Sequence, residues 1–242
     1  RLIAEDPRSA EVLKPFLAGR DIKRYEQPVA DKWLIFFPKG WTAQQGFSGR
    51  GAWAALEVKY PAIARWLAPL EEAGKKRCDQ GDYWWELRAC DYYGEFEKPK
   101  MMLPDISLRG NFILDETGGW MCANTCYILC NAEKWVLAIM NSNLLTWSYG
   151  NISTKFRGGY LRYFIQYMEI LPLPIIDANQ KAELDKLVDS LINLNKEDKL
   201  TTGSGSKILE TRIAATDRQI DQLVYKLYGL TEEEIGIVEG AI

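Results

Sequence analysis

The middle of the chain reads Asp82-Tyr-Trp-Trp-Glu-Leu-Arg-Ala-Cys-Asp-Tyr-Tyr-Gly-Glu-Phe-Glu-Lys-Pro-Lys-Met-Met-Leu-Pro-Asp-Ile-Ser107. Five aromatic residues fall between Tyr83 and Tyr93, and Arg88 lies among them. The apolar run from Met101 to Leu103 predicts a buried strand that follows a Lys-Pro-Lys turn. Aromatic rings beside Arg and Lys suit the stacking of bases and the binding of phosphates, although rings are also ordinary core material. Spacing alone leaves both interpretations of the aromatic run open.

The segments on either side of this run predict an α+β fold. Short aromatic or β-branched runs indicate strands, and apolar stripes at helical spacing indicate helices. The predicted strands are 32–38, 101–103, 111–115 and 120–130, the last two as a hairpin, and the predicted helices are 52–60, 62–76 and 132–145. We expect a core that includes Trp33, Ile35, Phe37, Met102, Ile113 and Ile128.

The composition changes after Pro174. Residues 181–194 and 207–228 each carry one apolar face, and a polar loop of Thr, Gly and Ser joins them. Helices of this length joined by a short loop pack antiparallel, and Gly229 is a typical helix end. The sequence therefore predicts a domain over residues 1–176 and a helical hairpin or spacer over residues 177–242.

The formal net charge of −3 is unevenly distributed. Residues 177–242 hold 8 of the 30 basic and 13 of the 33 acidic residues, a net charge of −5, which leaves +2 for residues 1–176. Between Asn141 and Met168 there are three cations and no acid. A local basic face on a weakly acidic chain is compatible with DNA binding.

The residue types limit the chemistry of the chain. It has no histidine, which excludes Ser–His and Cys–His catalysis, and its five cysteines lack the pairing of a zinc site, so we expect no catalytic and no metal-binding residue. Pro104-Asp105 occurs as in some nuclease sites, but no carboxylate-x-Lys sequence follows at moderate distance. No apolar run approaches the roughly 18 residues of a membrane helix. We therefore expect no membrane association and a cytoplasmic location with reduced cysteines.

Four separated motifs resemble the TaqI-like C-terminal specificity domain of adenine-specific DNA methyltransferases and type IIG restriction–modification enzymes. They are the Gly19-Arg-Asp-Ile-Lys-Arg-Tyr25 string, the central run, the segment from Asn131 to Ser142, and a Gly-Gly segment that leads to Leu171-Pro-Leu-Pro174. In the third motif Met140 stands where the family carries Leu. The chain's ending, from Ile220 to Ile235, is also similar to the tail of these proteins.

This resemblance implies a target-recognition domain, with a mixed β-sheet and flanking helices, that reads double-stranded DNA in phage defence. It implies that the chain is not an enzyme by itself and holds no cofactor. An upstream methyltransferase domain of the same polypeptide, with or without a fused endonuclease, would methylate adenine with S-adenosylmethionine. The chain begins without Met, and we expect it to be part of a longer protein.

The candidate DNA-binding residues are cations in the matching or flexible segments. They are Arg20, Lys23, Arg24, Arg50, Arg88, Lys100, Arg109, Lys155, Arg157 and Arg162. The alternative is a protein-interaction module of a phage-defence complex, with the aromatic run as its interface. A sugar-binding domain fits less well, because Lys and Arg surround the aromatic residues.

Overall fold

The computed structural model describes residues 1–156 and 158–240, except for the side chain of Ser204. By its internal contacts the chain forms two compact units. Unit 1 comprises residues 1–16, 30–97 and 119–121, and unit 2 comprises residues 17–29, 98–118 and 122–242. The helices after residue 176 thus share a unit with much of the chain before them. The predicted functional boundary between residues 176 and 177 stays a prediction.

Unit 1 combines a small sheet with short helices. Strands β1 (Leu13–Leu17) and β2 (Lys32–Ile35) pair antiparallel, and β6 (Met121–Cys122) completes the order β2-β1-β6. The helical segments are α1 (Leu2–Glu5), η1 (Pro7–Glu11), α2 (Trp41–Gln44), η3 (Gly49–Gly51), α3 (Ala52–Lys59), α4 (Pro61–Leu67), η4 (Ala68–Leu70), α5 (Glu71–Lys75) and η5 (Tyr93–Glu97). The predicted break at Pro61 is confirmed, because α4 begins at this residue, where the missing N–H costs no hydrogen bond.

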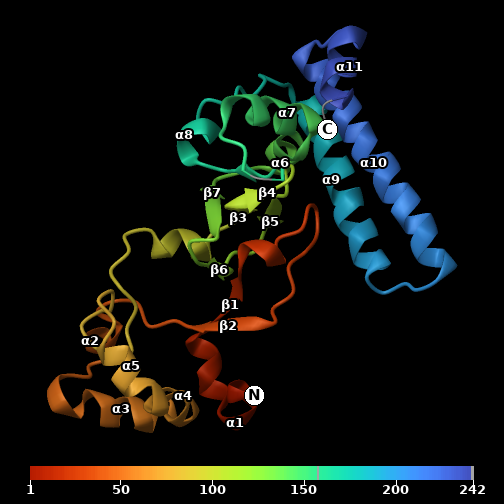
Figure 1. The fold of residues 1–242 in the computed structure, drawn as a ribbon. Helices are drawn as coiled ribbons and strands as arrows, with labels where there is room; N and C mark the ends of the chain where they lie inside the picture. The colour runs from red at the N-terminus through yellow and green to blue at the C-terminus, as the bar shows by residue number, and fades with distance from the viewer. Residues whose placement is uncertain (157, 241–242) are drawn as a thin grey trace. The chain divides into compact units, whose positions relative to one another are not determined.

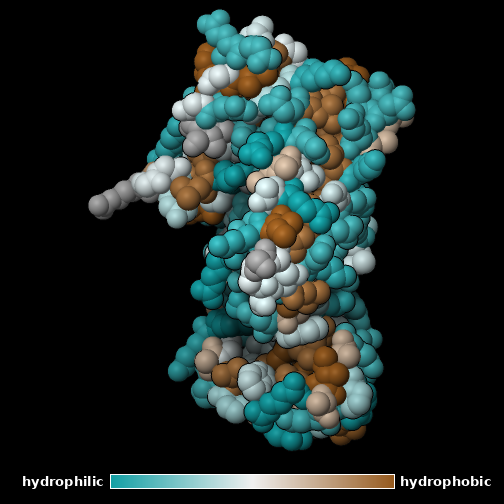
Figure 2. Space-filling model, turned by 90° about the vertical axis from the view of Figure 1, so that its right-hand side faces the viewer, coloured by the Kyte–Doolittle hydropathy of each residue, from teal (hydrophilic) through white to brown (hydrophobic). Residues whose placement is uncertain are grey.

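The core of unit 1 lies between β1 and the helices and includes Phe37, Leu56, Ile63 and Trp85. The prediction for Trp33 is wrong, since its side chain is 50% exposed. Strand β2 is an edge strand with one partner, which leaves Trp33 at the rim. Hydrophobic surface is visible as a brown area at the lower end of Figure 2. Trp33 and Trp66 also line a pocket of about 460 Å³ in this unit.

The sheets of unit 2 are built around β3 (Lys100–Pro104), whose five residues are all buried. Strands β5 (Ile113–Asp115) and β7 (Cys126–Cys130) flank β3 on opposite sides, both antiparallel to it, in the order β5-β3-β7. The predicted hairpin of 111–115 with 120–130 is therefore wrong. A buried strand must satisfy its backbone groups on both edges, and β5 and β7 do this for β3. A separate pair joins β4 (Ile106–Ser107) to β8 (Leu161–Arg162).

Unit 2 also contains helical segments. They are η2 (Gly19–Asp21), α6 (Lys134–Asn141), α7 (Asn143–Ile152), α8 (Ile165–Met168), α9 (Ala178–Asp198), α10 (Ser204–Tyr228) and α11 (Glu232–Gly240). The single helix predicted over 132–145 is divided at Ser142, which has extended backbone and whose hydroxyl accepts the N–H of Leu145 to cap α7. Helices α9 and α10 run side by side and antiparallel (Figure 1). The predicted helical hairpin and α+β class are confirmed.

The core of unit 2 lies around α6, whose residues from Trp135 to Asn141 are all buried. Helix α6 packs against α9 and β5, so the hairpin of α9 and α10 shares one core with the sheet. Met102 and Ile113 are buried as predicted, whereas Ile128 is half-buried. Within the described residues, no helix is both long and apolar enough to cross a membrane.

Candidate nucleic-acid interface

A tight turn in unit 2 presents aromatic and basic side chains. The N–H of Phe156 donates to the carbonyl of Tyr160 at 2.8 Å, and Lys155 forms a β-bridge with Leu161. Gly158 and Gly159 close the turn with φ of 85° and 81°, left-handed values that favour glycine. Phe156 and Tyr160 are 42% and 43% exposed at this turn. Arg157, a predicted DNA contact, lies outside the described residues.

Asp105 fixes the base of this turn. Its Oδ1 accepts a hydrogen bond from Nε of Arg162 at 3.1 Å and from the hydroxyl of Tyr127 at 3.3 Å. Its backbone carbonyl accepts the N–H of Tyr163 at 2.8 Å, and its own N–H donates to the carbonyl of Thr125. Burial and the Asp105 carboxylate raise the pKa of Tyr127, so its hydroxyl stays a donor.

The segment that carries Arg20 is attached to the same place. The N–H of Gly19 donates to Oγ1 of Thr125 at 3.1 Å. A Cβ on Gly19 would lie 2.4 Å from the carbonyl oxygen of Thr125, so only glycine allows this approach. Arg20 then projects with 80% of its side chain exposed.

Hydrogen bonds through Thr125 and Asp105 thus join two sequence-distant cationic segments. We call Arg20, Lys155, Phe156, Tyr160 and Arg162 the basic face. Lys155 is exposed, and the Arg162 side chain is 38% exposed. Three of the ten predicted cations are therefore in segments that these hydrogen bonds connect. Lys23 is exposed two residues after η2, and its DNA contact stays a prediction.

Lys100 must be removed from the predicted DNA contacts. Its side chain is fully buried, and its Nζ lies 2.5 Å from Oδ2 of Asp115, which is 1% exposed. The two residues face each other in register on β3 and β5. A DNA contact would require this pair to break and the charged group to leave the core.

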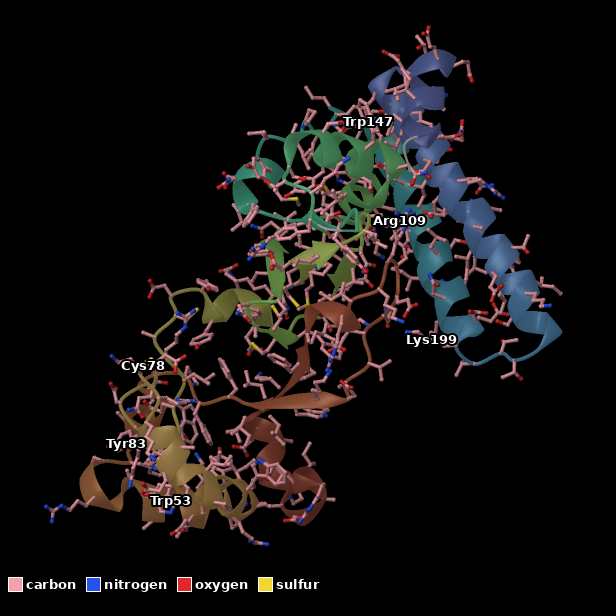
Figure 3. The ribbon with its side chains drawn as sticks, in the orientation of Figure 1. Trp53, Cys78, Tyr83, Arg109, Trp147 and Lys199 are labelled. Atoms are coloured by element: carbon pink, nitrogen blue, oxygen red, sulfur yellow. The ribbon has the colours of Figure 1, made fainter. Side chains whose placement is uncertain are left out.

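Arg24 also serves the fold. Its guanidinium donates to the carbonyl of Asn141 and pairs with Asp217 on α10, and it lies 5.0 Å from the ring centre of Tyr25. Arg109 reaches Asp217 at 3.3 Å and lies beside the hairpin of α9 and α10 (Figure 3). Burial and then the charge of Arg24 lower the pKa of Arg109. Arg24 is mostly buried and Arg109 is half-exposed. Because both pair with Asp217, both attach α10 to the strand region.

In unit 1 the central aromatic run is largely core. Trp85 is buried and stacks on Tyr83 with ring centres 4.7 Å apart, and Trp53 packs against it from α3 (Figure 3). Tyr92 remains exposed, as are the predicted contacts Arg50 and Arg88. Both cations belong to unit 1, whereas the basic face belongs to unit 2. Both stay predictions.

Glu86 is a structural residue that sequence reasoning missed. It is fully buried, and its carboxylate accepts the backbone N–H groups of Gly40, Thr42 and Asp82 at 3.1, 2.8 and 2.8 Å. Burial alone would raise the pKa of Glu86, but these hydrogen bonds and one from the Thr42 side chain hold it below its ordinary value. Glu86 thereby fixes Gly40 and the start of α2 against the aromatic cluster.

The described residues contain no group of three or more Cys, Asp or Glu that would suit a metal ion. What the arrangement offers is hydrogen-bond donors, positive charge and exposed rings. These groups can bind a ligand that accepts hydrogen bonds or carries negative charge.

The family model of the TaqI-like C-terminal specificity domain matches residues 14–173. The type II methyltransferase M.BstVI of Geobacillus stearothermophilus is 28% identical over 152 residues, which cover 60% of this chain and 22% of that protein. The type II methyltransferase M.BanIII of Aneurinibacillus aneurinilyticus is 27% identical over 123 residues, which cover 48% of this chain and 21% of that protein. The chain thus spans about a fifth of the length of these relatives.

Among solved structures, the type IIL restriction–modification enzyme MmeI in complex with DNA has a similar fold. The TM-score is 0.63 at 12% identity, and the match covers 95% of this chain and 30% of that one. At this identity the likeness concerns the fold. The family match covers well over half of the chain and confirms the resemblance read from its four motifs: the chain belongs to the family of TaqI-like C-terminal specificity domains.

Proposed function

We propose that this domain reads the DNA target sequence of a restriction–modification adenine methyltransferase, and that the basic face contacts the duplex. One observation carries the proposal: hydrogen bonds through Thr125 and Asp105 connect the segment of the exposed Arg20 to the turn that presents Arg162 and two exposed rings. The family is defined as a specificity domain, and the fold relative MmeI was solved with DNA. Both support DNA as the ligand.

The cations of the basic face suit two kinds of contact. Lys155 is an exposed point charge on a turn, which suits a phosphate. An arginine presents a planar fork that suits the edge of a guanine. Arg157 stays a candidate for this role from the sequence.

We assign the chemistry to another part of the same polypeptide. The relatives that match are methyltransferases, of which this chain covers about a fifth. The chain carries neither an Asn-Pro-Pro-aromatic loop for a flipped adenine nor a glycine-rich strand–helix turn for S-adenosylmethionine. An upstream methyltransferase domain in the cytoplasm would supply both, and no residue of this chain is assigned to the methyl donor.

The test measures duplex binding by the full-length polypeptide at several salt concentrations. Affinity should fall with salt at a log–log slope of about −0.9 per neutralised phosphate. Lys155→Ala should weaken binding to all sequences alike and reduce the slope by about one. The matched control is Lys186→Ala, which removes one exposed lysine from α9 and should leave the slope unchanged.

Two results would contradict the proposal. If the folded wild-type protein were not retained on any duplex at low salt, DNA would not be its ligand, and salt-insensitive capture of a protein partner would favour the interaction-module alternative. If Lys155→Ala and Lys186→Ala lowered the slope equally, the effect would be one of overall charge, and the basic face would not be the contact surface.

A further inference from the structure

Arg162 is held more firmly than a surface arginine that serves only for solubility. Its backbone pairs with Ile106 across β4 and β8, and its carbonyl accepts the hydroxyl of Tyr149 at 2.6 Å. Its guanidinium carbon lies 4.7 Å from the ring centre of Phe164 and 5.9 Å from that of Phe156, both within cation–π range. Strand pairing and aromatic contacts thus fix both ends of this side chain.

Asp105 adds direction to this restraint. Its carboxylate accepts Nε of Arg162 at 3.1 Å, which leaves the outer edge of the guanidinium, formed by the two Nη groups, without a bond to the acid. Among the described residues these Nη atoms have no hydrogen-bond partner, and they are not buried. Asp105 is itself fixed by Tyr127 and by the backbone of Thr125 and Tyr163. A positioned fork with two unused donors is therefore presented to a ligand.

The charge of the pair decides between the two acceptors that DNA offers. A phosphate would approach Arg162 beside the negative Asp105, and the two anions would repel each other. A guanine edge presents two neutral acceptors, O6 and N7, at the spacing of the guanidinium fork. Fixing the fork beforehand also removes the cost of ordering a flexible side chain on binding. Neutral base acceptors are thus favoured over phosphate.

We propose that Arg162 reads one guanine of the target through its Nη atoms, with Asp105 as its positioning residue. The proposal rests on the proposed DNA-reading function and names the base that the face selects. Asp105 itself does not touch the base. It sets the angle at which the arginine fork leaves the protein surface.

The experiment selects bound duplexes from a randomised pool with the full-length polypeptide and sequences them. Arg162→Lys keeps the charge but removes the fork, so the preference for guanine should fall by roughly 5- to 150-fold at one position. Other positions and the salt slope should not change. Asp105→Asn keeps the shape and an acceptor oxygen, and should reduce the preference at the same position by a smaller factor.

A double variant separates positioning from a general structural role. If Asp105 acts through Arg162, adding Asp105→Asn to Arg162→Lys should change the preference no further. The control Lys155→Ala should weaken binding without altering any preference. Thermal unfolding identifies variants that fail to fold. If Asp105→Asn is one of them, the pool selection with Arg162→Lys alone decides.

Failure of the inference and failure of the function look different. If the wild-type protein enriched no base sequence from the pool, DNA reading itself would be refuted. An enriched pool that Arg162→Lys leaves unchanged, or weakens equally at every position, would leave DNA reading intact and overturn the assignment of Arg162. Loss of preference at different positions in Asp105→Asn and Arg162→Lys would overturn the role of Asp105.

Discussion

Lys100→Met is predicted to destabilise the fold strongly without touching the DNA surface. The substitution removes the partner of Asp115 in a pair whose side chains are 0% and 1% exposed. In the variant, Asp115 still accepts the N–H of Gly118 at 2.9 Å, but its buried carboxylate loses the ammonium group of Lys100. Breaking a buried pair from one side costs about 3–5 kcal/mol. With about 2–4 °C of Tm per kcal/mol for domains of this size, Tm should fall by roughly 6–20 °C.

The assay is urea denaturation at pH 7, monitored by circular dichroism. The midpoints are compared between proteins whose fitted m-values agree. The double variant Lys100→Met/Asp115→Asn removes both charges and keeps an acceptor for Gly118, so it should recover about 2 kcal/mol or more of the loss. The exposed pair of Lys75 and Glu71, 2.6 Å apart, provides the control, and Lys75→Met should not change the midpoint measurably. A loss below about 1 kcal/mol in Lys100→Met, or no recovery in the double variant, would refute the reasoning. If the folded double variant also bound DNA with a log–log salt slope smaller by about one, Lys100 would have to be counted as a DNA contact after all.

Three further changes test other parts of the structure by the same denaturation assay. Glu86→Gln should cost roughly 1.5–3 kcal/mol at pH 7. Because hydrogen bonds hold the pKa of Glu86 below its ordinary value, this stabilisation is lost as pH falls through the lowered pKa, and a variant with wild-type acid sensitivity would contradict the reasoning. Burial raises the pKa of Asp221 to about 6, so the folded protein binds this proton more tightly than the unfolded chain does. The free energy of unfolding should therefore fall by about 3 kcal/mol as pH rises from about 4 to 6. Asp221→Asn should remove that fall, and an unchanged pH dependence in the variant would count against the reasoning. Gly229→Ala should cost about 1–2 kcal/mol because Gly229 ends α10 with φ of 69°, whereas Gly236→Ala, inside α11 with open space around it, should be neutral or stabilising.

Local signals in the sequence were sufficient for the hairpin of α9 and α10 and for the end of α10. Gly229 ends α10 in the left-handed conformation, as predicted, and Thr231 and Glu234 form a capping box, with Oε2 of Glu234 2.8 Å from the N of Thr231. These features depend on residues within four positions of each other, which is why pattern alone identifies them.

Strand order depended on information that the sequence pattern does not contain. The predicted hairpin placed β5 beside β7 because they follow one another, yet β3 lies between them. The one usable signal was the apolar run of 101–103, since a strand buried on both faces is typical of a central strand. Lys100 was misjudged for the same reason. Its position after Pro99 resembles an exposed turn, and only the register with Asp115 shows that it is buried.

The cations of one short segment show how far the DNA surface could be read from composition. Arg20 and Arg24 lie four residues apart in the same motif, but Arg20 is exposed and Arg24 is paired with Asp217, 193 residues away in the sequence. The same segment is also held by α9, because Asn195 donates to the carbonyl of Tyr25 and Lys199 pairs with Glu26 at 2.8 Å. Part of the acidic charge of residues 177–242 is therefore used to hold Arg24 and Arg109, rather than left to repel DNA. The helical hairpin supports the segment from which Arg20 projects, a role that a count of charges along the chain does not reveal.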